Sequence, residues 1–110
     1  ANSDDYNWTE TCMKNIGNRM WGLTLHHYTL PTGNWGAKGS ATVFDEAQYF
    51  STMKNCLKME DLVTKHSAIM DKYDPKKNVA LVVDEWGIWT DVEPGTNPGF
   101  LFQQNADASH

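Results

Sequence analysis

Cysteine is scarce in this chain of 110 residues, which contains only Cys12 and Cys56. Their spacing matches neither a disulfide framework nor a zinc motif. We therefore expect two free thiols within helices, which indicates a reducing compartment and predicts a cytoplasmic location. The chain also lacks an initiator Met, so we expect a processed protein or a piece of a longer one.

Long apolar runs and clusters of basic residues are missing as well. No stretch reaches the ~18 consecutive apolar residues of a transmembrane helix, so the sequence predicts no membrane partner. The formal net charge is -5 and no basic patch is present. A nucleic-acid partner, which would require clustered Lys and Arg, is therefore not predicted either.

Two kinds of catalytic signature are also absent. The sequence has no G-x-S-x-G motif for a nucleophilic serine. The adjacent His26 and His27 fall on an expected strand and would point to opposite faces, while His66 and His110 offer no recognised ligand spacing. We therefore predict neither a metal site nor a cofactor.

The residues that are present predict a small α/β domain. The helical spacing of apolar residues and the alternating or continuous apolar runs define its expected elements. A long helix between two strands would act as a right-handed crossover in a parallel sheet. The expected elements are a helix over Asp5–Asn15, a strand over Met20–Tyr28, a loop over Thr29–Phe44, one long helix from a capping box at Asp45 to Asp74, a strand over Val79–Val83 and a helix starting within Gly99–Asn105.

Aromatic residues are frequent, at 12% of the chain with five Trp. Flat aromatic faces suit a site that stacks apolar rings, and sugars are one such ligand. Trp35 lies in the long loop that follows the first strand, and loops of that length are usually retained for function. We therefore expect Trp35 to contact a ligand.

The segment N-V-A-L-V-V-D-E-W-G-I-W at Asn78 places two carboxylates after an apolar strand. In α/β folds ligands bind beyond the carboxyl ends of the strands, which is where Asp84 and Glu85 would lie. Neighbouring strand residues point to opposite faces, so Glu85 is the candidate for chemistry and Asp84, turned toward the helices, an orienting acceptor. A helix cap or a solvated turn is the alternative interpretation of this pair.

Several uncommon strings occur along the chain. They are A-N-S-D-D-Y-N-W-T-E at Ala1, G-L-T-L-H-H-Y-T at Gly22, G-S-A-T at Gly39, H-S-A-I-M-D at His66, V-D-E-W-G at Val83 and E-P-G-T-N-P-G-F-L at Glu93. Through these strings the chain resembles the catalytic barrel of glycoside hydrolase family 51, the α-L-arabinofuranosidases. The resemblance implies a partial (β/α)8 TIM barrel over residues 1–105 that carries strands six and seven, followed by a tail over 106–110 outside the family pattern. It also implies retaining hydrolysis of α-L-arabinofuranosyl linkages in plant cell-wall polysaccharides, with an arabinose-containing oligosaccharide or polysaccharide as partner.

The resemblance also implies roles for individual residues. Glu85 resembles the family's nucleophile, and Tyr28 the tyrosine that hydrogen-bonds it. His26 and Trp89 resemble residues of the substrate pocket. Retaining hydrolysis needs a second carboxyl group about 5 Å from the nucleophile. In the family that group follows an Asn on strand four, so we expect it to be absent from this chain.

Two other functions compete with this interpretation. One is a non-catalytic remnant of the barrel that binds sugar or assembles with itself. The other is a small hydrolase of different specificity that uses His26 or His27 as a base. The expected strand segments Gly22–Leu25 and Val79–Val83 carry no charge to protect open edges, so we predict a homo-oligomer.

Overall fold

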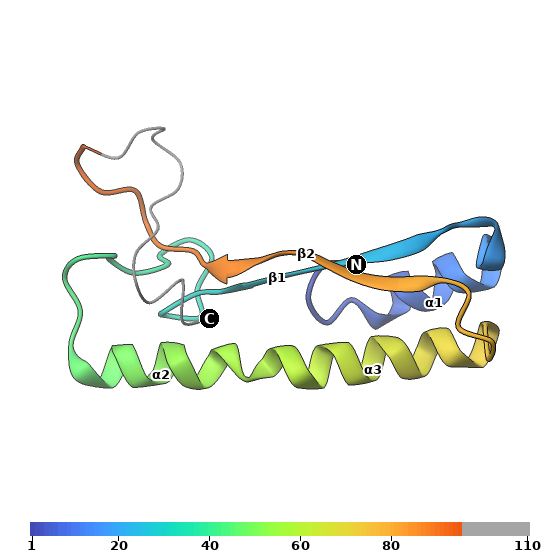
Figure 1. Ribbon diagram of the computed structural model, residues 1–110. Coiled ribbons are helices and arrows are strands. Elements are labelled where there is room, and N and C mark those ends of the chain that lie inside the picture. The colour runs from blue at the N-terminus through green and yellow to red at the C-terminus, as the bar shows by residue number, and fades with distance from the viewer. Residues whose placement is uncertain (96–110) are drawn as a thin grey trace. The chain divides into compact units, whose positions relative to one another are not determined.

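The computed structural model describes residues 1–95, which form helices and a two-stranded parallel sheet of β1 and β2 (Figure 1). The predicted α/β class is therefore confirmed at this level. The expected helix within Gly99–Asn105 and the tail 106–110 lie outside the described residues. In chain order the elements are α1 (Tyr6–Asn15), the 3₁₀ helix η1 (Gly17–Arg19), β1 (Gly22–Thr29), α2 (Glu46–Cys56), α3 (Lys58–Tyr73) and β2 (Ala80–Ile88).

The chain divides into two compact units, and each strand contributes to both. Unit 1 consists of Ala1–His27 and Lys58–Glu85. Unit 2 consists of Tyr28–Leu57 and the chain from Trp86 onward. The beginnings of both strands, with α1 and α3, therefore belong to unit 1, while the strand ends, the long loop and α2 belong to unit 2.

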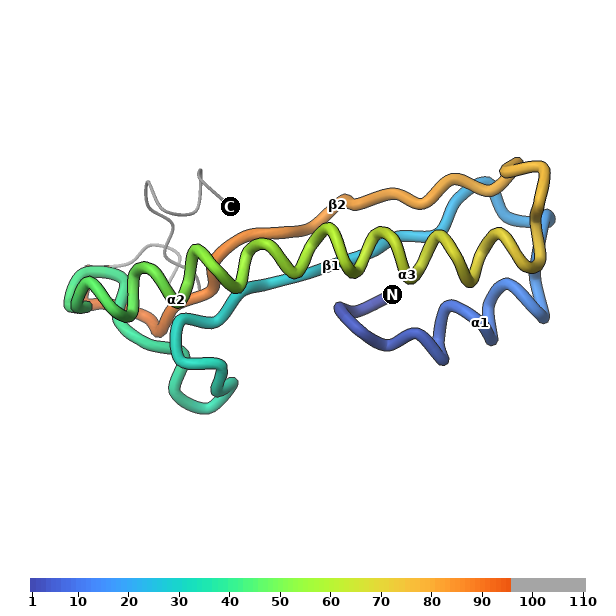
Figure 2. The backbone as a smooth tube through the Cα atoms, turned by 90° about the horizontal axis from the view of Figure 1, so that it is seen from below, coloured from blue at the N-terminus to red at the C-terminus, as the bar shows by residue number. Residues whose placement is uncertain are grey.

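The core of unit 1 lies where α1 and α3 pack side by side (Figure 2). Helix α3 buries Leu62, His66 and Met70, which recur every four residues and so share one face. On β1, Leu23 and Leu25 are buried while Thr24 between them is exposed, as the predicted alternation requires. The core cluster is completed by two further residues of neighbouring segments, Met13 and Val79.

The single long helix expected between Asp45 and Asp74 is wrong, because the structure has two helices. Its start is as predicted: the Gln48 N–H donates to the Asp45 carboxylate at 2.7 Å, and the Asp45 N–H donates to the Gln48 side chain at 3.0 Å. The break falls at Leu57, whose N–H bonds to the Lys54 carbonyl three residues back. This spacing is tighter than that of an α-helix and ends α2 without any Gly or Pro in the sequence.

Strand β2 also differs from the prediction, since it continues past Val83 to Ile88. Pairing with β1, and not the local apolar run, decides where it ends: the last bond runs from the Trp89 N–H to the Thr29 carbonyl at 2.9 Å. The residues from Ala80 to Trp86 are exposed or half-buried, so the expected cover on both faces is absent from the described part of the chain. The two carboxylates therefore lie within a strand instead of beyond it.

The segment Ala1–Ser3 covers part of one strand edge in unit 1. Asn2 forms a parallel bridge with His26, the His26 N–H donates to the Ala1 carbonyl at 2.9 Å, and the Ser3 N–H donates to the His26 carbonyl at 2.7 Å. The carbonyl of Trp21 bonds β2, so odd-numbered residues of β1 face β2 and His26 faces the other edge. One of the two edges predicted to be open is thus partly paired.

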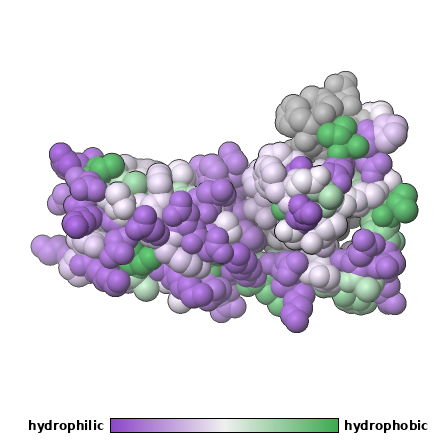
Figure 3. All heavy atoms as spheres, turned by 180° about the vertical axis from the view of Figure 1, so that it is seen from behind, coloured by the Kyte–Doolittle hydropathy of each residue, from purple (hydrophilic) through white to green (hydrophobic). Residues whose placement is uncertain are grey.

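The surface of unit 1 is mainly hydrophilic on the face seen in Figure 3, with isolated apolar residues. Neither Cys12 nor Cys56 forms a disulfide bond within residues 1–95. Both lie in helices, α1 and α2, as predicted. Among residues 1–95, no helix has the length and apolar character needed to cross a membrane.

Candidate active site

His26, Asp84 and Glu85 form the cluster of titratable groups on the strands of unit 1. The His26 Nε2 atom lies 3.1 Å from an Asp84 carboxylate oxygen, and its Nδ1 atom lies 3.3 Å from Glu85 Oε2. The three side chains are 34%, 43% and 52% exposed, so a ligand can reach them from solvent. The structure therefore brings the predicted nucleophile to a predicted pocket residue.

Asp84 and Glu85 do not point to opposite sides as predicted, because both reach the same imidazole ring. The imidazole ring accounts for this, since it has two nitrogen atoms and each contacts one of the two carboxylates. Asp84 still serves as an acceptor, but for His26 and not toward the helices.

The arrangement has a definite hydrogen-bonding capacity. A neutral imidazole carries one N–H and donates to one carboxylate, whereas an imidazolium donates to both. A doubly protonated His26 would therefore satisfy Asp84 and Glu85 together. Because the contact to Glu85 uses Oε2, the other oxygen of this carboxylate remains available to a reacting atom.

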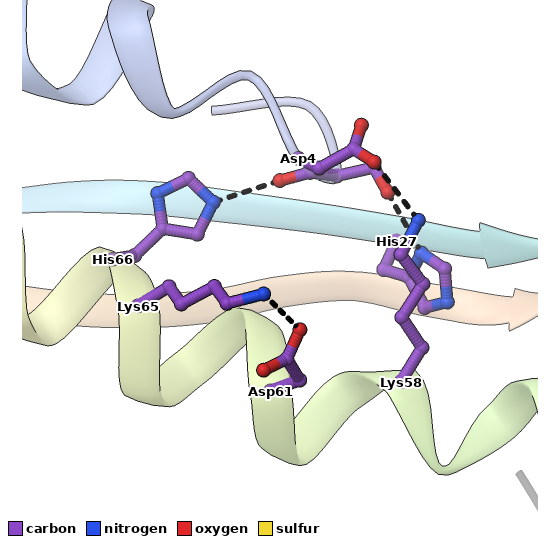
Figure 4. Close-up of polar contacts among 7 residues, drawn as sticks. Asp4, His27, Lys58, Asp61, Lys65 and His66 are labelled. Carbon is purple, nitrogen blue, oxygen red and sulfur yellow. Dashed lines mark hydrogen bonds and ion pairs between the residues drawn. The ribbon is translucent and has the colours of Figure 1, made fainter.

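Two other histidines, His27 and His66, belong to a hydrogen-bond network around Ser3 (Figure 4). His66 is fully buried; its Nε2 atom lies 2.7 Å from the Ser3 carbonyl and its Nδ1 atom 2.8 Å from the Thr9 hydroxyl. A carbonyl can only accept, so Nε2 donates. The Ser3 hydroxyl in turn hydrogen-bonds His27 Nδ1 at 3.2 Å. His66 thus fixes Ala1–Ser3, the segment that pairs with the backbone of His26.

This network argues against His27 as a general base. His27 is only 5% exposed, and its side chain forms a hydrogen bond with the Ser3 hydroxyl. Asp4, the residue after Ser3, forms a surface ion pair: the Lys58 ammonium lies 3.1 Å from its carboxylate, and this hydrogen bond lowers the pKa of the Asp4 carboxyl (Figure 4). The two histidines of this network therefore have structural roles.

Unit 2 gathers three of the predicted site aromatics. The Tyr28 and Trp89 rings meet edge to face at 4.9 Å, and the Trp35 and Trp89 rings do so at 5.0 Å. Trp35 is 61% exposed, so its ring is open to a ligand. Tyr28 and Glu85 belong to different units, and the hydrogen bond expected between them stays a prediction.

Two carboxylates, for which no sequence pattern predicted a role, hold the long loop that carries Trp35 in place. The Asp91 carboxylate accepts the N–H groups of Lys38 and Gly39 at 3.2 and 3.1 Å. The Glu93 carboxylate accepts the Ser40 hydroxyl and the N–H of the next residue. The bond from Ser40 is the main reason that the pKa of Glu93 is lowered. Asp91 and Glu93 lie three and five residues after the end of β2, and no local pattern marks them, because their bonds span about fifty residues of sequence.

No group of three or more His, Cys, Asp or Glu side chains within residues 1–95 is placed to hold a metal ion.

Comparison with known proteins gives the chemical context of these residues. The chain is 54% identical over 105 residues to an intracellular exo-α-L-arabinofuranosidase of Bacteroides ovatus, covering 96% of this chain and 20% of that protein. It is 57% identical to the crystal structure of a family 51 arabinofuranosidase from Xanthomonas axonopodis pv. citri, with a TM-score of 0.87, over 97% of this chain and 22% of that one. The resemblance to glycoside hydrolase family 51 is confirmed.

The chain spans about a fifth of the length of these arabinofuranosidases. The α/β fold is accordingly similar to a fragment of a family 51 enzyme. No protein-family model matches the chain.

Proposed function

We propose that this chain is the part of an α-L-arabinofuranosidase barrel that supplies the catalytic nucleophile, Glu85. The observation that carries the proposal is the contact of Glu85 with His26, on strands of a chain that is more than half identical to two arabinofuranosidases. Residues 1–105 would then provide strands six and seven of a (β/α)8 barrel. The parallel pair of β1 and β2 with intervening helices supports that assignment.

The proposed reaction is retaining hydrolysis of an α-L-arabinofuranosyl linkage. The free oxygen of Glu85 attacks the anomeric carbon, and the bond to the leaving-group oxygen breaks as a second carboxylic acid protonates that oxygen. The same group then removes a proton from water, which displaces Glu85 and releases arabinose. We assign the second carboxyl group to a part of the barrel outside this chain.

His26 would hold Glu85 in position for this attack. An N–H of its ring donates to Oε2 and orients the carboxylate, while Asp84 accepts from the other nitrogen and keeps the ring in place. Tyr28 would add a hydrogen bond to the nucleophile. Trp35 and Trp89 would stack against sugar rings, since Trp35 is exposed and the half-buried Trp89 meets it edge to face.

Formation of the covalent intermediate tests the proposal. An aryl α-L-arabinofuranoside with a very acidic phenol as leaving group needs little protonation, so the missing carboxyl group matters least for this substrate. We expect the chain to release one equivalent of phenol and to retain one arabinosyl group on Glu85, detected by peptide mass spectrometry. Labelling of any other carboxylate would refute the assignment.

A hybrid enzyme provides the complementary test. This chain would replace the matching 105-residue segment of the Bacteroides ovatus enzyme, which restores the second carboxyl group. Arabinofuranosidase activity is the expected result. A folded hybrid that binds the substrate but has no activity would show that this chain does not supply a working nucleophile.

A non-catalytic sugar-binding role is the second candidate. It is favoured by the exposed ring of Trp35, which could bind sugar without any reaction. Binding of arabino-oligosaccharides to the chain, together with an inactive hybrid, would support this role over hydrolysis.

The expected surroundings of the protein follow from the same relatives. The Bacteroides ovatus protein is named an intracellular enzyme. We propose the same cytoplasmic location for this chain, and two cysteines without a disulfide within residues 1–95 fit that location. Arabinose-containing oligosaccharides that enter the cell would be its substrates.

A further inference from the structure

The ammonium group of Lys38 lies over the two tryptophans of unit 2. Its Nζ atom is 5.0 Å from the centre of the Trp35 ring and 5.9 Å from the centre of the Trp89 ring. Both distances are within the range of a cation–π interaction, which orients the ammonium but leaves its positive charge in place. The side chain of Lys38 is half-buried, so the charge is held at the aromatic surface instead of extending into solvent.

No carboxylate of residues 1–95 forms an ion pair with Lys38; the ion pairs of the other lysines there involve Lys58, Lys65 and Lys77. Asp91 contacts this loop, but its two carboxylate oxygens accept hydrogen bonds from the backbone N–H groups of residues 38 and 39. The Lys38 ammonium is therefore held at the exposed Trp35 ring without an ion-pair partner within residues 1–95.

We propose that Lys38 binds the carboxylate of a uronic acid in the glycan that carries the arabinofuranosyl group. This inference rests on the proposed function and names its substrate class, an acidic arabinofuranosylated oligosaccharide. A sugar ring stacked on Trp35 would place an equatorial carboxylate near the ammonium. The bond formed would be a charge-assisted N–H to carboxylate hydrogen bond, which is shorter and stronger than a neutral one.

The loop geometry supports a specific role for this lysine. Asp91 and Glu93 fix the backbone on both sides of Gly39, so the base of the Lys38 side chain has a defined position. A lysine on a free loop would gain little from such an ion pair, because it would lose much side-chain and backbone entropy. Here the backbone part of that entropy is already lost on folding, and the two tryptophans restrict the stem.

The test compares two ligands that differ only in charge. The first is an arabinofuranosylated oligosaccharide with one glucuronic acid, and the second is the same compound with its carboxyl group reduced to an alcohol. The full chain is titrated with each, and binding is followed through the indole N–H signals of Trp35 and Trp89 by NMR. We expect the acidic ligand to bind about five-fold more tightly at low salt, with a smaller ratio at high salt.

Variants show whether Lys38 causes the preference for the acidic ligand. In Lys38→Met, which keeps much of the apolar stem, the ratio should fall to about one, whereas Lys38→Arg should retain a ratio above one. Lys54→Met, a charge removal on α2 of the same unit, is the matched control and should leave the ratio unchanged.

The outcomes separate the two proposals. Equal binding of both ligands by the unmodified chain, or a preference that survives in Lys38→Met, would overturn the role of Lys38 while leaving the sugar site intact. If neither ligand shifts the indole signals, the aromatic sugar site itself is refuted, and the role of Lys38 with it.

Discussion

The assignment of Glu85 as the nucleophile can be tested by substituting this one residue, which contacts His26. In the hybrid enzyme, Glu85→Gln keeps the size and shape of the side chain but removes its nucleophilic oxygen. We expect the turnover number to fall by at least about a thousand-fold.

Asp84→Asn is the matched control, because its amide oxygen still accepts a hydrogen bond from His26. Its loss should be much smaller, about ten-fold. Comparable losses in the two variants, measured with the same aryl arabinofuranoside, would mean that Glu85 has no distinct chemical role.

Among the substitutions considered, we expect His66→Ala to lower the free energy of unfolding most. The side chain is fully buried and bridges the Ser3 carbonyl and the Thr9 hydroxyl. His66→Ala therefore creates a cavity and removes the partner of the buried Thr9 hydroxyl and of the half-buried Ser3 carbonyl. We expect the free energy of unfolding to fall by about 2–4 kcal/mol in urea titrations. Lys65→Ala, which removes the exposed neighbour of His66, should lower the free energy of unfolding much less, because its ion pair with Asp61 is exposed.

At the scale of elements, the turn between α3 and β2 depends on Asp74. Its carboxylate accepts the Val79 N–H at 2.7 Å and the Asn78 side-chain amide at 2.9 Å. The bond from Val79 is the main cause of a lowered pKa of Asp74 relative to its ordinary value of 3.8. Because the folded-state pKa is lowered, the stabilisation is complete above 3.8 and is lost as the pH falls through the lower value.

A pH series with Asp74→Asn checks this contribution. The urea midpoint of the variant should lie below that of the unmodified chain at about pH 6, and the difference should shrink as the pH falls below about 3.8. Taking the difference between the two proteins removes the effects of other acidic groups with lowered pKa, such as Asp4 and Glu93. A difference that does not change with pH would show that the charge of Asp74 is not involved.

The same turn contains a strained residue. Lys77 has a φ angle of 54°, in the left-handed region that favours glycine. Its ion pair with Asp71 is largely exposed and therefore stabilises little. We expect Lys77→Gly to raise the free energy of unfolding by up to about 1 kcal/mol, whereas Lys76→Gly, at a position without a positive φ angle, should lower it. Chemical denaturation shows whether each substitution raises or lowers the free energy of unfolding.

At the scale of the whole molecule, self-association remains a prediction. Several large apolar side chains are exposed, among them Trp21 at 81% and Leu57 at 74%. The paired segment Ala1–Ser3 covers part of one edge of β1, which leaves β2 as the strand with no neighbour on its outer edge in the described chain. An edge of this kind offers unpaired N–H and C=O groups to another chain.

Light scattering behind a sizing column should therefore give a mass above that of one chain at micromolar concentration. Val82→Lys on β2 should shift the distribution toward the monomer, because charge at an edge opposes strand addition. Thr64→Lys on the exposed part of α3 adds the same charge away from the strands and is the control. A monomer at all concentrations would contradict the prediction.

The sequence alone determined the features that depend on neighbours in the chain. The capping box at Asp45, the helix over Tyr6–Asn15 and the alternation on β1 follow from local hydrogen bonds and from side-chain periodicity. The resemblance to family 51 also rested on local strings, and it pointed to Glu85, His26 and Trp89 without any knowledge of their contacts.

Tertiary structure alone decided the features that depend on pairing between distant segments. Strand β2 continues through its two carboxylates to Ile88, and Asp84 and Glu85 both contact His26 of β1. The fixed position of Lys38 depends likewise on Asp91, more than fifty residues away. Such long-range contacts leave no periodic signal in the sequence, because their energy comes from groups that meet only when the chain has folded.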